Sequence, residues 1–261
     1  MSIYRVILCA QSSFVDHPFA DVIVASSVVD VILVPEGFEH RSVQHCIKRS
    51  SPPLPVVLAI PIGPAALSAH LHQWIGSGNV FNPESRVLLI GLGGALSDRL
   101  HVGDGVLMEM CGQQLDGKDT HWISCDRALT AAIANRAGGL QSGRLITTAG
   151  VVCSRLEKLR LGRETQADVV DMEGFTALEI LSVAGHHVAI LRVVSDDRDH
   201  DLPDLALAVS PSGSVQALPL LLACLKRPLA AIRLISGSLQ ALRALSLLTQ
   251  QLFGDAARRE A

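Results

Sequence analysis

Five short runs of apolar residues constrain the fold of this chain more than any other feature. The runs are rich in Val, Ile and Leu and do not alternate with polar residues, which is typical of strands buried on both faces of a parallel sheet. They cover residues 28–35, 55–63, 86–94, 144–150 and 187–195. A sixth strand is predicted over 102–111, where a Gly-Asp turn precedes an apolar segment.

Helical patterns lie between these strands. Pro64 is expected to be the first residue of a helix that ends at Gly76, and Asp126 to be the N-cap of a helix over 127–137. Apolar residues at helical spacing predict a further helix over 175–184. Because strands and helices alternate, we expect an α/β fold with a mixed, mostly parallel central sheet flanked by helices.

The two ends of the chain differ from this central pattern. Two leucine-rich helices are predicted near the C-terminus, over 216–226 and 229–252. We therefore expect a single domain over 1–261, in which 1–27 form an added strand and helix and 211–261 form a helical extension. The extension either covers an edge of the sheet or forms a subunit interface.

The composition excludes several classes of protein. Hydrophobic residues make up 49% of the chain and charged residues 18%, which favours a large buried core, and the net charge of −3 does not favour binding to nucleic acid. The six cysteines lack C-x-x-C spacing, which argues against a metal site and is typical of a reducing cytoplasm. The apolar run 218–225 is too short for a membrane span, which needs about 20 residues.

The glycine-rich segment GLGGAL at 91–96 follows a predicted strand but is not a cofactor motif. Leu96 stands where a G-x-G-x-x-G fingerprint needs its last glycine, so a nicotinamide-dependent oxidoreductase has little support and no cofactor is expected. The glycines indicate a close approach of the backbone to a ligand or to a packed neighbouring element. The chain also lacks the G-x-S-x-G and H-E-x-x-H motifs.

Acidic residues lie next to three of the predicted elements, at positions where ligands bind in open parallel sheets. Glu36 and Glu39 follow the first strand, Asp196 and Asp197 follow the strand over 187–195, and the segment DMEG at 171–174 precedes a helix. Taken singly, such acids are often helix caps or solvated loop residues. An acid in an apolar stretch needs a partner, however, and three such sites together predict a pocket lined by carboxylates.

These segments resemble the purine nucleoside phosphorylase and nucleosidase superfamily. The motifs are IGLGGALSDRLHVGDGV at 90–106, DMEG at 171–174 and LRVVSD at 191–196, in family order and at fitting spacing. The resemblance covers about residues 28–205. It implies an enzyme that cleaves the N-glycosidic bond of a purine-type or 5′-modified nucleoside and works as a homo-oligomer.

The resemblance also implies roles for individual residues. Asp196 would be the general acid that protonates the purine ring, with Ser195 orienting it. Glu173 would accept hydrogen bonds from the ribose 2′- and 3′-hydroxyls, and Met172 would pack against the sugar.

Two further sets of residues complete the implied site. Gly93 and Gly94 would bring the backbone close to the ligand. In hydrolytic members a glutamate after the first strand activates water, and we assign this role to Glu39, with Glu36 as the alternative.

The chain departs from the family pattern in its base pocket. Val152 and Cys153 lie where many members have an aromatic residue, so they are expected to contact the base and adenine specificity is not implied. The phosphate co-substrate of a phosphorylase needs cations or exposed N–H groups. Arg86 lies at the wrong end of its strand, and nothing singles out Arg41 or Arg99, which favours hydrolysis over phosphorolysis. A non-catalytic nucleoside-binding protein of the same fold is a further alternative.

Overall fold

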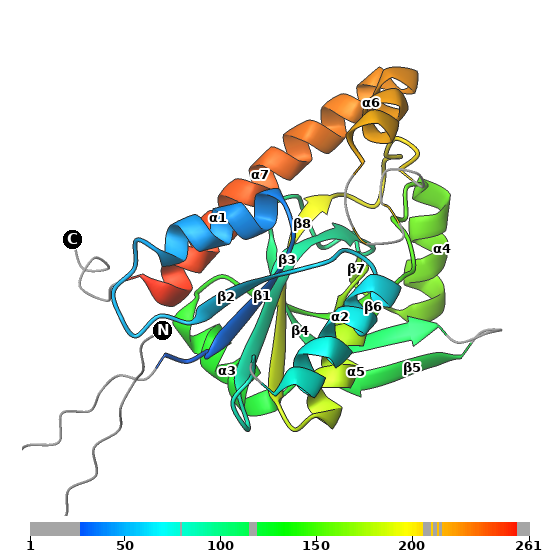
Figure 1. Ribbon diagram of the computed structural model, residues 1–261. Helices are drawn as coiled ribbons and strands as arrows, with labels where there is room; N and C mark the ends of the chain where they lie inside the picture. Colours follow the sequence, from blue (N-terminus) through cyan, green and yellow to red (C-terminus); the bar gives the residue numbers. More distant parts are fainter. Residues whose placement is uncertain are drawn as a thin grey trace, which may run out of the picture.

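The computed structural model describes residues 27–78, 80–114, 119–205, 210, 213 and 216–254. In this part of the chain an eight-stranded mixed sheet is flanked by seven helices (Figure 1). The strands are β1 (Val31–Pro35), β2 (Val56–Ile60), β3 (Arg86–Ala95), β4 (Gly105–Gln114), β5 (Thr120–Ser124), β6 (Gln141–Thr147), β7 (Val169–Asp171) and β8 (His187–Asp196). The helices are α1 (Phe38–Ile47), α2 (Pro64–Ser77), α3 (Arg127–Arg136), α4 (Arg155–Thr165), α5 (Gly174–Val183), α6 (Ala217–Lys226) and α7 (Pro228–Phe253).

The strand order is β2-β1-β3-β7-β6-β4-β5, and β8 pairs with both β3 and β4. Pairing is parallel between β1 and β2, β1 and β3, β3 and β8, β4 and β6, and β6 and β7. It is antiparallel between β3 and β7, β4 and β5, and β4 and β8. The expected mixed, mostly parallel sheet is therefore confirmed. Since β1, β3 and β8 run parallel, their carboxyl ends lie at one edge of the sheet.

Both faces of the central strands are covered, which explains why their sequences do not alternate. In β8, Ile190 belongs to a core cluster shared with α2 and α5, whereas its neighbours Ala189 and Leu191 belong to a cluster shared with α1, α3 and α7. Successive side chains on a strand point to opposite faces, so each face needs its own apolar residue at every second position.

The first residues of two helices follow their sequence signals. Asp126 caps α3, because its carboxylate accepts a hydrogen bond from the Leu129 amide at 2.8 Å. Pro64 is the first residue of α2, as expected. The expected end of α2 at Gly76 is wrong: the helix continues to Ser77, and Gly78 ends it because Gly78 adopts the left-handed conformation, with φ of 65°.

Four elements were not predicted from the sequence, namely α1, α4, β5 and β7. The α1 and α4 sequences are polar and have few apolar residues at helical spacing, and β7 has only three residues. The strand expected over 102–111 begins only at Gly105 and continues to Gln114. The addition expected at 1–27 lies outside the described residues, apart from residue 27.

Both expected C-terminal helices are present as α6 and α7. The second half of α7 packs onto the sheet beside α1, through Ala241, Leu245 and Leu252. Figure 1 shows α6 and the start of α7 projecting beyond the sheet. Among the described residues, α7 is the one helix long and apolar enough, by length and composition, to cross a membrane.

Candidate functional site

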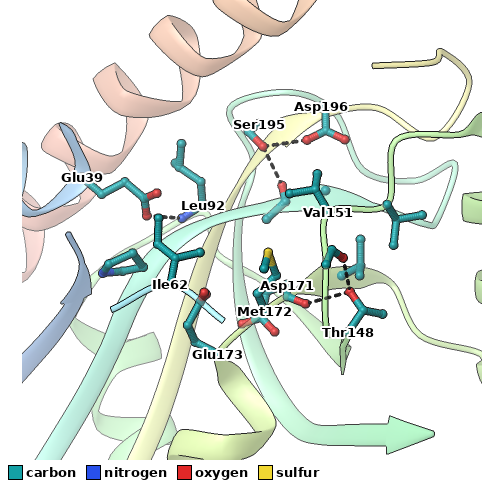
Figure 2. A pocket seen from close by; sticks show the side chains of 16 residues that line it. Glu39, Ile62, Leu92, Thr148, Val151, Asp171, Met172, Glu173, Ser195 and Asp196 are labelled. Carbon is teal, nitrogen blue, oxygen red and sulfur yellow. Dashed lines mark hydrogen bonds between the residues drawn. The ribbon is translucent and has the colours of Figure 1, made fainter. Parts of the chain in front are cut away.

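A pocket with a volume of about 160 Å³ lies where the strands end at one edge of the sheet (Figure 2). It brings together eight of the nine residues that we expected in the site. These are Glu39, Gly93, Gly94, Val152, Met172, Glu173, Ser195 and Asp196. The other lining residues are Pro35, Ile62, Leu92, Thr148, Gly150, Val151, Val170 and Asp171. Five chain segments far apart in sequence, which carry the expected residues, therefore converge on one pocket.

Two of the sequence candidates lie elsewhere. Cys153, expected to contact the base, does not line this pocket but a larger adjoining cavity of about 980 Å³, which α6 also lines through Leu222 and Ala223. The reason is that Cys153 packs with Leu205 and Ala223, under the C-terminal helices. Glu36, the alternative to Glu39, is exposed and does not line the pocket.

Glu39 reaches the pocket from the first turn of α1. Its Oε2 accepts a hydrogen bond of 2.8 Å from the backbone amide of Leu92 in β3, which holds the carboxylate against the glycine-rich strand (Figure 2). Burial raises the pKa of Glu39, and the nearby Arg192 and the Leu92 amide oppose that shift. A carboxylate with a raised pKa that faces a pocket is suited to accept a proton.

Glu173 is buried at the start of α5. Its Oε1 accepts a hydrogen bond of 3.0 Å from the Gly63 amide, and its Oε2 lies 3.4 Å from Nη2 of Arg192. Burial and the neighbouring Asp171 raise the pKa of Glu173 to about 7, although Arg192 lowers it. The carboxylate is therefore held at the pocket wall by a backbone amide and a buried cation.

Arg192 is the central buried charge of the site, and no role for it was expected from the sequence. Its side chain has no exposed surface, and its Nε and Nη2 both donate to Oδ2 of Asp171, with an Nε distance of 2.9 Å. Asp171 also accepts hydrogen bonds from Thr147 Oγ1 at 2.7 Å and the Gly174 amide at 2.9 Å. Asp171 therefore orients Arg192 and fixes the start of α5.

A glycine brings Arg192 close to Glu39. A Cβ atom on Gly91 would lie 2.5 Å from Arg192 Nη1 and 2.6 Å from Glu39 Oε2, so these two atoms are within about 5 Å of each other. Nη1 is buried and has no hydrogen-bond partner among the described residues. A buried donor without a partner is costly, and it marks a position where a bound polar atom would gain a hydrogen bond.

Asp196, at the end of β8, lies between a hydroxyl and a buried lysine. Ser195 Oγ lies 2.7 Å from Oδ1 of Asp196 and 3.2 Å from the Gly93 carbonyl oxygen (Figure 2). On the other side, Nζ of Lys158 bonds Oδ2 of Asp196 and donates to the Asp197 carbonyl at 2.7 Å. Lys158 has no exposed surface, and it was missed in the sequence because α4 reads as a charged surface helix.

Gly93 and Gly94 line the pocket and are also needed for packing. A Cβ on Gly93 would lie 2.8 Å from Val169 Cγ1, and one on Gly94 would lie 2.9 Å from Asp196 Oδ2. The close approach of a packed neighbour, one of the two possibilities left open by the sequence, is confirmed, since β7 and the Asp196 carboxylate both lie against these glycines. A larger residue at Gly94 would displace the Asp196 carboxylate, and one at Gly93 would displace β7.

The pocket is anionic. None of the sixteen described lining residues is Lys, Arg or His. The arginines considered for phosphate binding are engaged elsewhere: Arg86 pairs with Asp30 at the opposite end of β3, and Arg99 pairs with Asp168. Arg41 lies over the exposed Phe38 ring. The buried Lys158 and Arg192 are each paired with carboxylates.

Comparisons with known proteins agree with the fold and the motifs. Residues 38–226 match the family model described as the phosphorylase superfamily. Futalosine hydrolase of Helicobacter pylori is 15% identical, with a TM-score of 0.62 over 86% of this chain and 97% of that chain. A 5′-methylthioadenosine/S-adenosylhomocysteine nucleosidase of Helicobacter pylori is 15% identical, with a TM-score of 0.62 over 87% and 98%.

A third similar structure is a putative 5′-methylthioadenosine/S-adenosylhomocysteine nucleosidase from Francisella philomiragia, 16% identical with a TM-score of 0.62 over 85% of this chain and 96% of that chain. A search among curated proteins found no significant match. The family match covers most of the chain and confirms the expected enzyme class, a nucleosidase or phosphorylase. The chain belongs to the phosphorylase superfamily.

Proposed function

We propose that this protein hydrolyses the N-glycosidic bond of a purine-type nucleoside. The observation that supports this most is the convergence of Glu39, Glu173 and Asp196 on one pocket from three separate strand ends. Cleavage of such a bond develops positive charge on the sugar and negative charge on the base. An anionic pocket with one proton donor at its rim suits both changes.

In this mechanism Asp196 donates a proton to the purine ring, and the bond between C1′ of the sugar and the ring nitrogen breaks with its electron pair leaving on the base. Lys158 and Ser195 hold the two oxygens of Asp196, so its orientation toward the base is set before the substrate binds. The aliphatic wall of Val151 and Val152 would contact the base, without an aromatic stacking partner.

Glu173 binds the ribose hydroxyls, and the electron-deficient sugar is stabilised by the carboxylates around it. A water molecule held by Glu39 then attacks C1′ and transfers its proton to Glu39. The position of Glu39 on the pocket wall and the burial that raises its pKa support this assignment.

The charge of the pocket favours water over phosphate as the nucleophile. Two buried cations lie beside the pocket, and four carboxylates face them. The carboxylates are Glu39, Asp171, Glu173 and Asp196. Both buried cations are already paired with carboxyl groups, and none of the described lining residues is a cation, so a phosphate dianion entering this site would find no side-chain cation free to bind it.

The test is to incubate the purified protein with a panel of purine nucleosides that differ at the 5′ position, with and without inorganic phosphate. Free base and free sugar formed at equal rates in both arms would support hydrolysis. Sugar phosphate formed only with phosphate would assign phosphorolysis instead. Tight nucleoside binding without release of base would identify a binding protein of the same fold.

A further inference from the structure

Helix α6 and the first half of α7 carry their large apolar side chains on the outside. Eight leucine and isoleucine residues of this segment are 50–71% exposed, and we call them the α6–α7 apolar face. They are Leu218, Leu221, Leu222, Leu225, Leu229, Ile232, Ile235 and Leu239. The side chains of the same segment that are described as buried are small: Ala223, Ala230, Ala231 and Gly237. This is the reverse of an amphipathic helix that covers its own core.

The exposed residues form stripes rather than scattered positions. In α6 they occur at spacings of three, four and seven residues from Leu218, and in α7 they recur every three or four residues from Leu229 to Leu239. Residues at these spacings lie on one side of a helix. Apolar stripes of this kind indicate an interaction surface rather than the scattered apolar residues of an ordinary protein exterior.

The α6–α7 apolar face cannot turn toward the sheet, because the small residues on the other side of these helices already contact the rest of the protein. Gly237 packs so closely on the Ser195 carbonyl that a Cβ would collide with it. Gln240 Nε2 donates a hydrogen bond of 2.7 Å to the Val102 carbonyl, and Leu234 packs near Leu205. The outward orientation is therefore part of the fold, and Figure 1 shows α6 and the start of α7 projecting past the sheet.

The charge of this segment points to the kind of partner. Residues 216–240 contain three exposed cations and no acidic residue, although the whole chain has a net charge of −3. The cations are Lys226, Arg227 and Arg233. Arg227 lies 3.6 Å from Asp201, and that pair is exposed to solvent. A symmetric contact with a second copy would bring equivalent patches, and hence like charges, together. An anionic lipid surface complements both the cations and the apolar side chains.

We propose that the α6–α7 apolar face docks this protein on the surface of an anionic lipid bilayer, lying in the interface without crossing it. Helix α7 is long enough to cross a bilayer, but Ala241, Leu245 and Leu252 are buried against the sheet and α1. Crossing would require the core to open. Docking leaves the core intact and places the cavity lined by Leu222 and Ala223 beside the lipid surface.

The experiment is vesicle flotation with the full chain, using phosphatidylcholine alone and phosphatidylcholine mixed with phosphatidylglycerol. We expect partitioning at least about tenfold stronger on the anionic vesicles, and a loss of that preference at high salt. A triple variant, Leu225→Gln with Leu229→Gln and Ile232→Gln, should lose at least about tenfold of the binding. The matched control is Val183→Gln, because Val183 is 86% exposed but lies at the end of α5; it should bind as the unaltered protein does.

Three results would overturn the proposal. The first is the absence of flotation, and the second is equal flotation of the triple variant and the unaltered protein. The third is a dimer of the unaltered protein in light scattering that becomes a monomer in the triple variant, with neither protein binding vesicles; this would assign the face to a second copy. If the variant folds poorly, the dependence of vesicle binding by the unaltered protein on salt and on anionic lipid still tests the proposal. None of these measurements depends on catalysis.

Discussion

The buried pair of Lys158 and Asp196 supports the sharpest prediction for this site. The side chain of Lys158 has no exposed surface and that of Asp196 is 14% exposed, so water screens the pair weakly. The variant Lys158→Met removes the ammonium and keeps the length of the side chain. Removing one partner of a buried pair costs about 3–5 kcal/mol, because the other charge is left without compensation. Asp196 keeps the Ser195 hydroxyl and some solvent contact, so we expect the free energy of unfolding to fall by about 3 kcal/mol.

The reciprocal variant, Asp196→Asn, should cost more. It leaves the enclosed ammonium of Lys158 with the Asp197 carbonyl at 2.7 Å as its remaining strong partner, and we expect a loss of about 4 kcal/mol. The double variant removes both charges and should lose only about 2 kcal/mol, far less than the sum of the single losses.

The assay is urea unfolding of all four proteins under one set of conditions, with the midpoint and slope fitted separately. If the two single losses simply add in the double variant, the pair is not coupled and the reasoning is refuted. Turnover provides the second readout: Asp196→Asn should lose about 10²–10⁴-fold in kcat, the usual contribution of a general acid. Lys158→Met should lower kcat by a smaller factor and leave KM nearly unchanged, as expected of a positioning residue.

Three further predictions concern the opposite side of the pocket. Because burial raises the pKa of Glu173 from 4.5 to about 7, the folded protein holds a proton that the unfolded chain releases, so its free energy of unfolding should fall by about 3 kcal/mol as the pH rises through this window. Urea unfolding at several pH values should show that Glu173→Gln reduces this slope, with the remainder due to Glu39, whose pKa is also raised by burial; an unchanged slope would contradict the assignment. Gly91→Ala should force Glu39 and Arg192 apart, costing about 1–3 kcal/mol in urea unfolding and most of the turnover, whereas wild-type kinetics would show that their spacing is unimportant. Glu39→Gln should lose about 10²–10⁴-fold in kcat with little change in stability, while the exposed Glu36→Gln serves as its control; equal effects of the two would remove Glu39 from the mechanism.

The strands and the site candidates were predictable to different degrees. The central strands were recognised because burial on both faces leaves a local signature in the sequence, a continuous apolar run. Helices α1 and α4 left no such signature, since only three residues of each are buried. The residues at strand ends were found because parallel strands end at one edge, whereas Cys153 was misplaced because its neighbours come from α6, far along the chain.

Lys158 could have been suspected from its position on α4. Lys158, Leu161 and Thr165 are the buried residues of that helix, and their spacing places them on one side of it. A lysine on the buried side of a helix requires an acidic partner. Its partner is Asp196, which is 38 residues away in the sequence, so spacing within the helix alone would not have identified it.

The sequence by itself determined the fold class, the family and the acidic edge of the sheet, because each of these depends on local patterns of apolar residues or on short motifs. Tertiary structure alone decided which charges neutralise one another. Arg192 could have paired with any of several carboxylates, and it is the contact of β8 with β7 and the start of α5 that gives it Asp171 and Glu173. Tertiary structure also decided that the leucines of α6 face outward, because a helical pattern shows which residues share a side but not which side meets the core.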